Sequence, residues 1–157
     1  MPFPYSITIG GEAGFGIMSA GLTLTKVATR SGYHAFTYSE YPSIIRGGHN
    51  VTTIAISDEV IRSQYELIHF LIALNRETIT LHESRVIDGG VILYDNKNIK
   101  IKKPRSGVHY LHVPFDALAT THGGSAIMRN SVALGATLAL LWGDLSTLAS
   151  LTEEEFS

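Results

Sequence analysis

The chain has 157 residues, of which 45% are hydrophobic and 17% charged, and it contains no cysteine. This length corresponds to one domain, which buries enough surface to fold without cross-links. The lack of cysteine excludes disulfides, thiolate zinc sites, a cysteine nucleophile and cysteine-held iron–sulfur clusters within the chain, and the net charge of −2 argues against nucleic acid as a partner.

The N-terminus has neither the basic segment nor the apolar core of a signal peptide. The longest apolar run, Val132–Trp142, is interrupted by Gly135 and Thr137 and is shorter than the roughly 18 residues of a membrane span. We therefore expect a cytoplasmic chain without a membrane segment.

The first elements predict a strand–helix–strand unit. Tyr5–Ile9 is typical of a strand, and we expect it to end in a turn at Gly10-Gly11. Apolar residues at helical spacing follow over 17–28, Ser31-Gly32 ends this helix, and His34–Tyr38 predicts the next strand. A strand, a glycine-rich loop, a helix and a strand in this order are typical of a βαβ unit.

Strands and helices alternate along the rest of the chain. The expected strands are Val51–Ser57, Leu67–Leu74, Val91–Tyr94 and Tyr110–Val113. The expected helices cover 78–86 (ending at Gly89-Gly90), 115–122 and 125–142. The continuous hydrophobicity of Leu67–Leu74 indicates a central parallel strand. This order predicts a three-layer α/β fold, with a mostly parallel, Rossmann-like sheet and helices on both faces.

Four glycines, Gly10, Gly11, Gly14 and Gly16, lie between the first strand and the first helix. Without Cβ atoms the backbone can turn sharply and bring its N–H groups to a phosphate at the positive end of the helix. The spacing is not the Gly-x-Gly-x-x-Gly dinucleotide fingerprint, because counting from Gly14 the third glycine would fall at Ser19. NAD is therefore disfavoured, while a phosphate-bearing ligand remains possible. The alternative is a tight turn whose glycines serve packing only.

The segment Tyr38–Asn50 concentrates polar side chains and a Gly-Gly pair around Pro42. Arg46, beside Gly47 and Gly48, can present its guanidinium to an anion while the backbone comes close. A segment between the second and third strands lies at the carboxyl edge of a parallel sheet, where ligands of α/β folds bind. The alternative is an ordinary surface loop with a solvated arginine.

Two motifs carry a family resemblance: Gly-Gly-Glu-Ala-Gly-Phe-Gly-Ile at 10–17 and Glu-Tyr-Pro-Ser-Ile-Ile-Arg-Gly-Gly-His-Asn at 40–50. Together they resemble the gamma domain of 2-oxoacid:ferredoxin oxidoreductases, in the form fused at the N-terminus of the alpha subunit. The resemblance extends over nearly the whole chain, through Leu71–Asn75, Gly89–Asp95, Val113–Phe115, Arg129-Asn130 and Val132–Gly135. The chain departs from the family at Ile68-His69-Phe70, where an aspartate is usual.

The resemblance implies a multi-subunit complex that converts a 2-oxoacid such as pyruvate or 2-oxoglutarate, with CoA, into acyl-CoA, CO2 and reduced ferredoxin. Residues 1–157 would be one CoA-binding gamma domain, cut off within its C-terminal helix and inactive alone. Thiamine diphosphate, Mg and iron–sulfur clusters would lie on the alpha and beta partners, with no catalytic residue here. The choice of 2-oxoacid would lie there too.

The resemblance also assigns a ligand site in two parts. The phosphates of CoA would contact Gly11, Gly14, Phe15 and Gly16. The facing wall, or the contact with the thiamine-binding partner, would consist of Arg46, Gly47, Gly48, His49 and Asn50.

Seven histidines raise the question of a metal site. His109 and His112 are three residues apart on an expected strand, so they point to opposite faces and cannot hold one ion. We expect His69 to be a hydrogen-bonded core residue and His82 to lie on a helix surface. Only His49 is a candidate site residue, and no metal site is predicted because no spacing matches a known ligand pattern.

The basic run Lys97–Arg105 predicts a solvated rim, or alternatively an electrostatic guide for an anionic ligand or acidic ferredoxin.

Two further functions stay open for the whole chain. One is a free-standing α/β enzyme with a nucleotide cofactor. The other is a structural assembly domain.

Overall fold

The structure, a computed structural model, describes residues 4–41, 48–123 and 128–141. Six strands form one sheet in the order β2-β3-β1-β4-β5-β6. The strands are β1 (Tyr5–Glu12), β2 (His34–Glu40), β3 (His49–Ser57), β4 (Ile68–Ala73), β5 (Val86–Tyr94) and β6 (His109–His112). The helices are α1 (Ile17–Arg30), α2 (Arg76–His82), the 3-10 turn η1 (Glu83–Arg85), α3 (Phe115–Gly123) and α4 (Arg129–Leu141).

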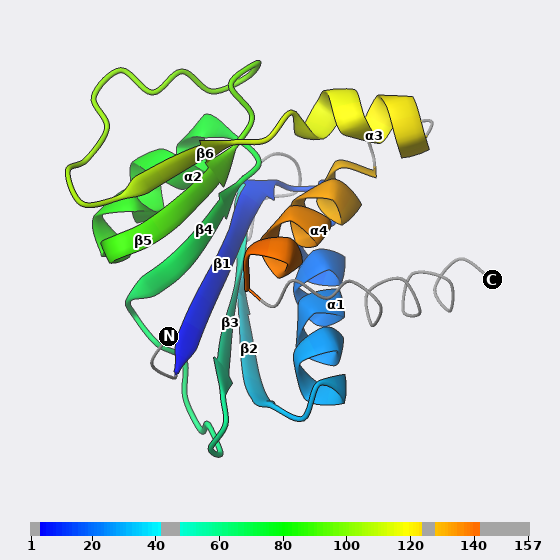
Figure 1. The fold of residues 1–157 in the computed structure, drawn as a ribbon, viewed down its shortest axis with the longest axis vertical. Helices are drawn as coiled ribbons and strands as arrows, with labels where there is room; N and C mark the ends of the chain where they lie inside the picture. Colours follow the sequence, from blue (N-terminus) through cyan, green and yellow to red (C-terminus); the bar gives the residue numbers. More distant parts are fainter. Residues whose placement is uncertain (1–3, 42–47, 124–127, 142–157) are drawn as a thin grey trace.

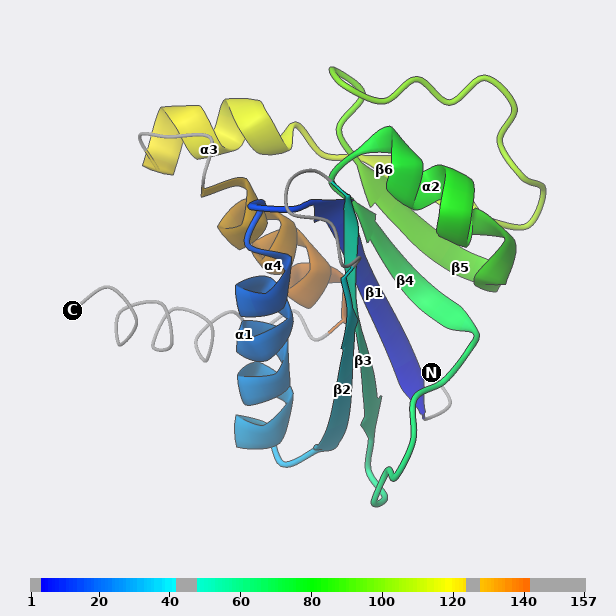
Figure 2. The same cartoon turned by 180° about the vertical axis from the view of Figure 1, so that it is seen from behind.

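Helices cover both faces of the sheet, which confirms the three-layer α/β prediction. Helices α1 and α4 lie on one face (Figure 1), and α2 lies on the opposite face (Figure 2). Two successive glycines of β1 face opposite sides of the sheet. A Cβ at Gly10 would meet Thr78 of α2, and a Cβ at Gly11 would meet Ile17 of α1.

The sheet is mostly parallel, with one inserted antiparallel strand. Strands β1, β4, β5 and β6 run parallel, whereas β3 is antiparallel to both β1 and β2. Strand β2 therefore has the direction of β1, and β1, α1 and β2 form a βαβ unit with β3 between its strands. As a result, the carboxyl ends of β1, β2, β4, β5 and β6 and the start of β3 share one edge of the sheet, here called the carboxyl edge.

Two apolar clusters form the core, one on each face. The larger cluster packs α1 and α4 on the sheet and includes the fully buried Leu24 and Leu138, and the smaller cluster includes Ile79 of α2. Alternate residues of β4 enter the two clusters, since Ile72 belongs to the first and Leu71 to the second. This two-sided burial explains the continuous apolar run and confirms the central strand.

The turn expected at Gly10-Gly11 is wrong, because β1 continues through both glycines. Gly10 lies opposite Val51 of β3 and Gly11 lies opposite Asn50, so the ladder is unbroken there. A Cβ at Gly10 would stand 2.6 Å from Cγ2 of Thr78. Gly10 thus permits α2 to approach the strand closely.

The connection between the expected strands His34–Tyr38 and Val51–Ser57 is shorter at both ends. Strand β2 continues to Glu40, and β3 begins at His49, because the two strands pair with each other as far as Glu40 opposite Val51. Arg46 and Gly47 fall outside the described residues.

The helix expected over 78–86 also ends early. Helix α2 stops at His82, and β5 already begins at Val86 and runs through Gly89 and Gly90. A Cβ at Gly90 would lie 2.8 Å from the carbonyl oxygen of Ile87, where the register with β4 shifts. The glycine pair therefore marks an irregularity inside a strand rather than a helix end.

Candidate functional site

The two predicted motifs meet at the carboxyl edge. In the β1–β3 ladder Glu12 lies opposite His49, and the N–H of Ala13 donates to the carbonyl oxygen of Gly48 at 3.1 Å. The glycine loop (residues 13–16) and the segment Gly48–Asn50 therefore form one continuous surface. The parts predicted for Arg46 and Gly47 stay predictions, since the described residues do not include them.

The glycine loop exposes the start of α1. Gly14 and Gly16 adopt the left-handed backbone conformation, with φ of +92° and +69°, and both are exposed. Gly16 is the N-cap of α1, which has no side-chain cap among the described residues and no acidic residue in its first turn. The first N–H groups of a helix lack partners within the helix, and the helix dipole makes this end positive. The loop thus has the chemistry of an anion site.

Gly11 lies in a different setting from Gly14 and Gly16. It is buried in β1, and a Cβ there would stand 3.1 Å from the side chains of Ile17, Leu74 and Phe15. A side chain at this position would therefore push on these three neighbours, so the glycine has a packing role here. The ligand contact assigned to Gly11 stays a prediction.

The first residues of helix α4 contact the glycine loop at Phe15. Reasoning from the residues did not predict α4 as part of the site. The Asn130 side-chain amide donates to the carbonyl oxygen of Phe15, and the Arg129 guanidinium lies 4.3 Å from the centre of the Phe15 ring. Arg129 also pairs with Asp116 of α3 at 3.5 Å. The Arg129-Asn130 motif was visible only through the family resemblance, because it is far from the loop in sequence.

His49 pairs with His82, so the expectation that His82 lies on a helix surface is wrong. Their Nε2 atoms are 2.8 Å apart, and His82 is 8% exposed. Burial, reinforced by the nearby His49 and Arg85, lowers the pKa of His82 to about 4. Burial also lowers the pKa of His49, against the opposing pull of Glu77 and Glu40. Both rings are therefore neutral at neutral pH.

The histidine pair borders an open pocket of about 470 Å³. Glu40 and Tyr41, which end β2, and Leu81 of α2 form other parts of its wall. The pocket lies on the α2 side of the sheet, because His49 and Val51 point to the side where Gly10 meets Thr78. His49 thus faces this pocket, while Asn50 projects to the α1 side.

The other histidines have structural settings. The Nδ1 atom of His69 accepts a hydrogen bond from the Ser6 N–H at 3.2 Å, and burial lowers its pKa, which confirms a hydrogen-bonded core residue. His109 and His112 lie on β6 as expected. Over the described ranges no group of three or more His, Cys, Asp or Glu side chains could hold a metal ion. Within the same ranges no helix is long and apolar enough to cross a membrane.

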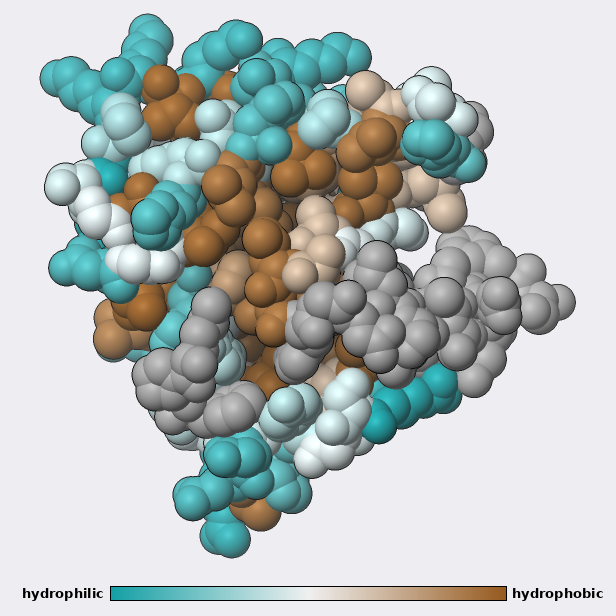
Figure 3. Space-filling view, viewed as in Figure 1, coloured by the Kyte–Doolittle hydropathy of each residue, from teal (hydrophilic) through white to brown (hydrophobic). Residues whose placement is uncertain are grey.

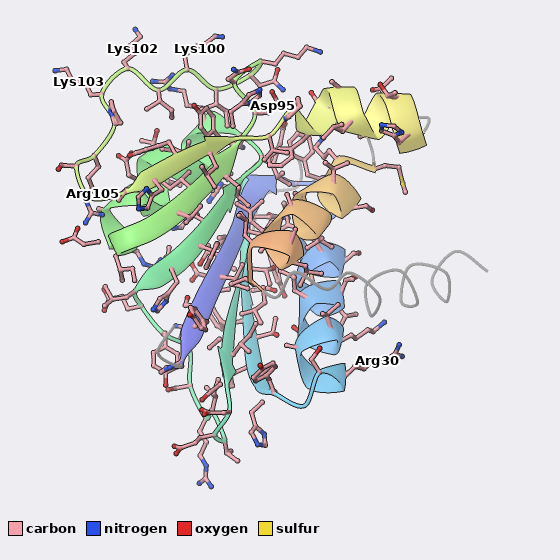
Figure 4. All side chains as sticks on the ribbon, viewed as in Figure 1. Arg30, Asp95, Lys100, Lys102, Lys103 and Arg105 are labelled. Atoms are coloured by element: carbon pink, nitrogen blue, oxygen red, sulfur yellow. The ribbon has the colours of Figure 1, made fainter. Side chains whose placement is uncertain are left out.

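The basic run is a loop anchored at both ends. Asp95 is buried and accepts from the N–H groups of Lys97 and Asp116, and Arg105 donates to the carbonyl oxygen of Glu83. Between these anchors the side chains of Lys100, Lys102 and Lys103 point outward and apart (Figure 4). They border a pocket of about 400 Å³ against α2, which includes Arg76 and Ile79. The loop therefore presents an exposed cationic surface.

Comparison with known proteins relates this fold to one family. The family model described as pyruvate ferredoxin/flavodoxin oxidoreductase matches residues 6–156. The ketoisovalerate oxidoreductase subunit VorA of Methanothermobacter thermautotrophicus is 34% identical over 96% of this chain and 30% of its own length. The 2-oxoglutarate synthase subunit KorC of Archaeoglobus fulgidus is 25% identical over 90% of this chain and 73% of its own length.

Solved structures give the same relation. The 2-oxoglutarate:ferredoxin oxidoreductase of Magnetococcus marinus, solved with 2-oxoglutarate, coenzyme A and succinyl-CoA bound, matches 99% of this chain with a TM-score of 0.90 and 25% identity. The keto/oxoacid ferredoxin oxidoreductase gamma subunit of Geobacter sulfurreducens matches 88% of this chain and 77% of its own, with a TM-score of 0.77 and 28% identity. The chain spans only 27% of the Magnetococcus chain and 30% of the ketoisovalerate subunits.

Proposed function

Because the chain belongs to the pyruvate ferredoxin/flavodoxin oxidoreductase family, we propose that it is the gamma-type domain of a 2-oxoacid:ferredoxin oxidoreductase and that its glycine loop binds CoA. The complex would convert a 2-oxoacid and CoA into acyl-CoA, CO2 and reduced ferredoxin. Residues 1–157 would act as one binding domain. They would hold CoA for a reaction at thiamine diphosphate on the partners and supply no catalytic residue.

The observation that carries this proposal is the uncapped, exposed start of α1 beside the segment Gly48–Asn50. CoA bears phosphates, and backbone N–H groups at a helix N-terminus bind phosphate without a charged side chain. The Magnetococcus relative, whose fold matches nearly all of this chain, was solved with CoA bound. Gly14, Phe15 and Gly16 would contact the phosphates, with His49, Asn50 and the predicted Arg46 on the facing wall.

Exposed apolar side chains support the proposal that partner subunits dock on the face that carries α4. Apolar side chains run across the middle of this face, over the strands beside α4 and toward α3 (Figure 3). Val91 and Val113 are only partly buried, and Leu111 is 38% exposed. Contiguous exposed apolar surface is typical of protein interfaces. The alpha and beta partners would dock here and carry thiamine diphosphate, Mg and the iron–sulfur clusters, because the chain has no cysteine to hold a cluster.

Calorimetric titration of CoA tests the binding proposal, with Gly14→Ala as the variant and Gly32→Ala as its control. Both glycines have a left-handed backbone, with φ of +92° and +87°, and open space where a Cβ would be, but Gly32 lies at the far end of α1. Each substitution costs about 1 kcal/mol of backbone strain. We expect micromolar binding, about 8 kcal/mol, which Gly14→Ala weakens at least tenfold and Gly32→Ala leaves unchanged.

A chain that binds no CoA, or two variants with equal affinity, would contradict the proposal. Such a result would favour a structural assembly domain, for which the close packing at Gly10 and Gly11 is the supporting observation. Arg46→Ala extends the test to the facing wall. It should weaken CoA binding without changing the unfolding midpoint.

A further inference from the structure

The contact between His49 and His82 joins two elements that both border the pocket on the α2 side of the sheet. His49 begins β3, and His82 ends α2, 33 residues later. Their ring centres are 5.0 Å apart and the ring planes are inclined by 29°. The His49 ring also lies over β1, since its Cε1 atom would be 3.0 Å from a Cβ at Gly10.

Two Nε2 atoms at 2.8 Å share one proton between them when both rings are neutral. Arg85 identifies the ring that carries it. The Arg85 guanidinium has only donors, and its Nη1 lies 3.5 Å from Nδ1 of His82, so this nitrogen is the acceptor. His82 then carries its proton on Nε2 and donates it to Nε2 of His49. His49 in turn carries its own proton on Nδ1.

The surrounding charges leave this arrangement neutral. Glu40 of β2 and Glu77 of α2 favour a protonated His49, but burial outweighs them. Arg85 of η1 and the neighbouring ring add to the burial that disfavours a protonated His82. The Nε of Arg85 donates to the carbonyl oxygen of Glu66 at 2.9 Å, which holds the guanidinium beside the pair.

We propose that His82 and Arg85 are positioning residues that hold His49 neutral, in the tautomer with its proton on Nδ1. The proposal rests on the proposed function in one respect, namely that His49 belongs to the wall of the ligand site. The ring is thereby fixed against β1 just before the glycine loop, and it adds no charge to a site that binds an anion. At Nδ1, the nitrogen that does not contact His82, the His49 ring then has an N–H donor and no acceptor lone pair.

The Nδ1 atom of His49 is buried and has no hydrogen-bond partner among the described residues. In this tautomer the atom is a donor, and a buried donor without an acceptor is costly. An oxygen acceptor satisfies the N–H that this tautomer presents, and a second donor or a cation does not.

Nitrogen-15 NMR of the full chain at pH 7 tests the proposal, because each neutral tautomer of histidine has its own pair of nitrogen shifts. We expect the Nδ1–H pattern for His49 in the wild-type chain. His82→Gln keeps a side-chain N–H donor and should retain this pattern. His82→Leu cannot donate and should release His49 to the Nε2–H form or a mixture.

An Nε2–H pattern in the wild-type chain, or an unchanged pattern in His82→Leu, would overturn the proposal. The wild-type spectrum alone decides the tautomer if the leucine variant does not fold. CoA titration separates this result from the proposed function. In a chain that binds CoA, His82→Leu should weaken binding several-fold and His82→Gln should restore it. A chain that has the predicted tautomer but binds no CoA would refute the function and leave the proton arrangement intact.

Discussion

Burial, more than charge, sets the protonation of His49, His69 and His82. His82 shows this most clearly, because its pKa falls to about 4 although carboxylates lie near its partner His49. The sequence placed His82 on a helix surface from local spacing alone. Its burial depends on β3, whose start brings His49 against the end of α2.

The lowered pKa predicts a stability that falls as the solution becomes acidic. Between pH 6.5 and 4 the unfolded chain binds a proton at His82 and the folded chain does not, so acid favours unfolding. The stability present above pH 6.5 should fall by up to about 3 kcal/mol across this interval. Urea unfolding midpoints at pH 7.5, 5.5 and 4.5 measure the change.

His82→Gln is the matched variant for this measurement, because glutamine fills a similar volume and does not titrate. Its stability should depend less on pH than that of the wild-type chain. His49 and His69, whose pKa values burial also lowers, remain in both proteins. Identical pH dependence in the two proteins would show that His82 titrates normally in the folded state.

At the scale of elements, the connection after β4 depends on one capping residue. Asn75 follows β4 and caps α2, and its Oδ1 accepts from the N–H of Thr78 at 3.0 Å and from its hydroxyl at 2.8 Å. Thr78 is the residue that packs on Gly10. The cap therefore also positions α2 on β1.

Asn75→Ala should cost about 1 kcal/mol of unfolding free energy, because the alanine leaves a first-turn N–H without its acceptor. Asn75→Asp keeps the oxygen and should be near neutral. Urea denaturation of the three proteins measures the difference. Equal losses in both variants would mean that the asparagine acts through some contact other than its Oδ1.

The sequence predicted the elements around this site better than their pairing. The helix after the glycine-rich segment and the central strand at Leu67–Leu74 follow from local patterns and are confirmed. The antiparallel insertion of β3 was not predicted, because a strand of Val, Ile and Thr reads the same in either direction. The glycines also looked alike, although Gly10 and Gly11 are packed in a strand and Gly14 and Gly16 have positive φ.

At the scale of the whole molecule, one loop carries a run of basic residues with no acidic residue among them. The chain carries −2 overall, yet no acidic residue occurs between Asp95 and Asp116. Five basic residues, Lys97, Lys100, Lys102, Lys103 and Arg105, lie in this interval. A surface with charge of one sign speeds the association of oppositely charged partners. Salt screens the charges, so this effect weakens as the salt concentration rises.

If the loop guides acidic ferredoxin, the double variant Lys100→Glu with Lys102→Glu should slow association about tenfold at low salt. The salt dependence of the association rate should also become weaker, since fewer cations take part. Stopped-flow mixing of the chain with ferredoxin at several salt concentrations measures both quantities.

Lys26→Glu with Arg30→Glu is the charge-matched control, because both residues lie on α1. Figure 4 shows Arg30 far from the labelled lysines of the loop. It changes the net charge equally and should leave the rate near that of the wild-type chain. Equal slowing in both double variants would assign the effect to net charge. The loop would then be the solvated rim that the sequence also allowed.

By itself the sequence determined the α/β class, most of the elements and the two motifs of the candidate site, because periodicity and glycine clustering depend on neighbouring residues. Tertiary structure decided which of these features meet. The contact of Asn130 with Phe15 joins residues 115 positions apart, and that of His49 with His82 joins residues 33 apart. Such contacts follow from the order and direction of the strands. Local pattern does not encode that order, since it arises only when the whole sheet packs.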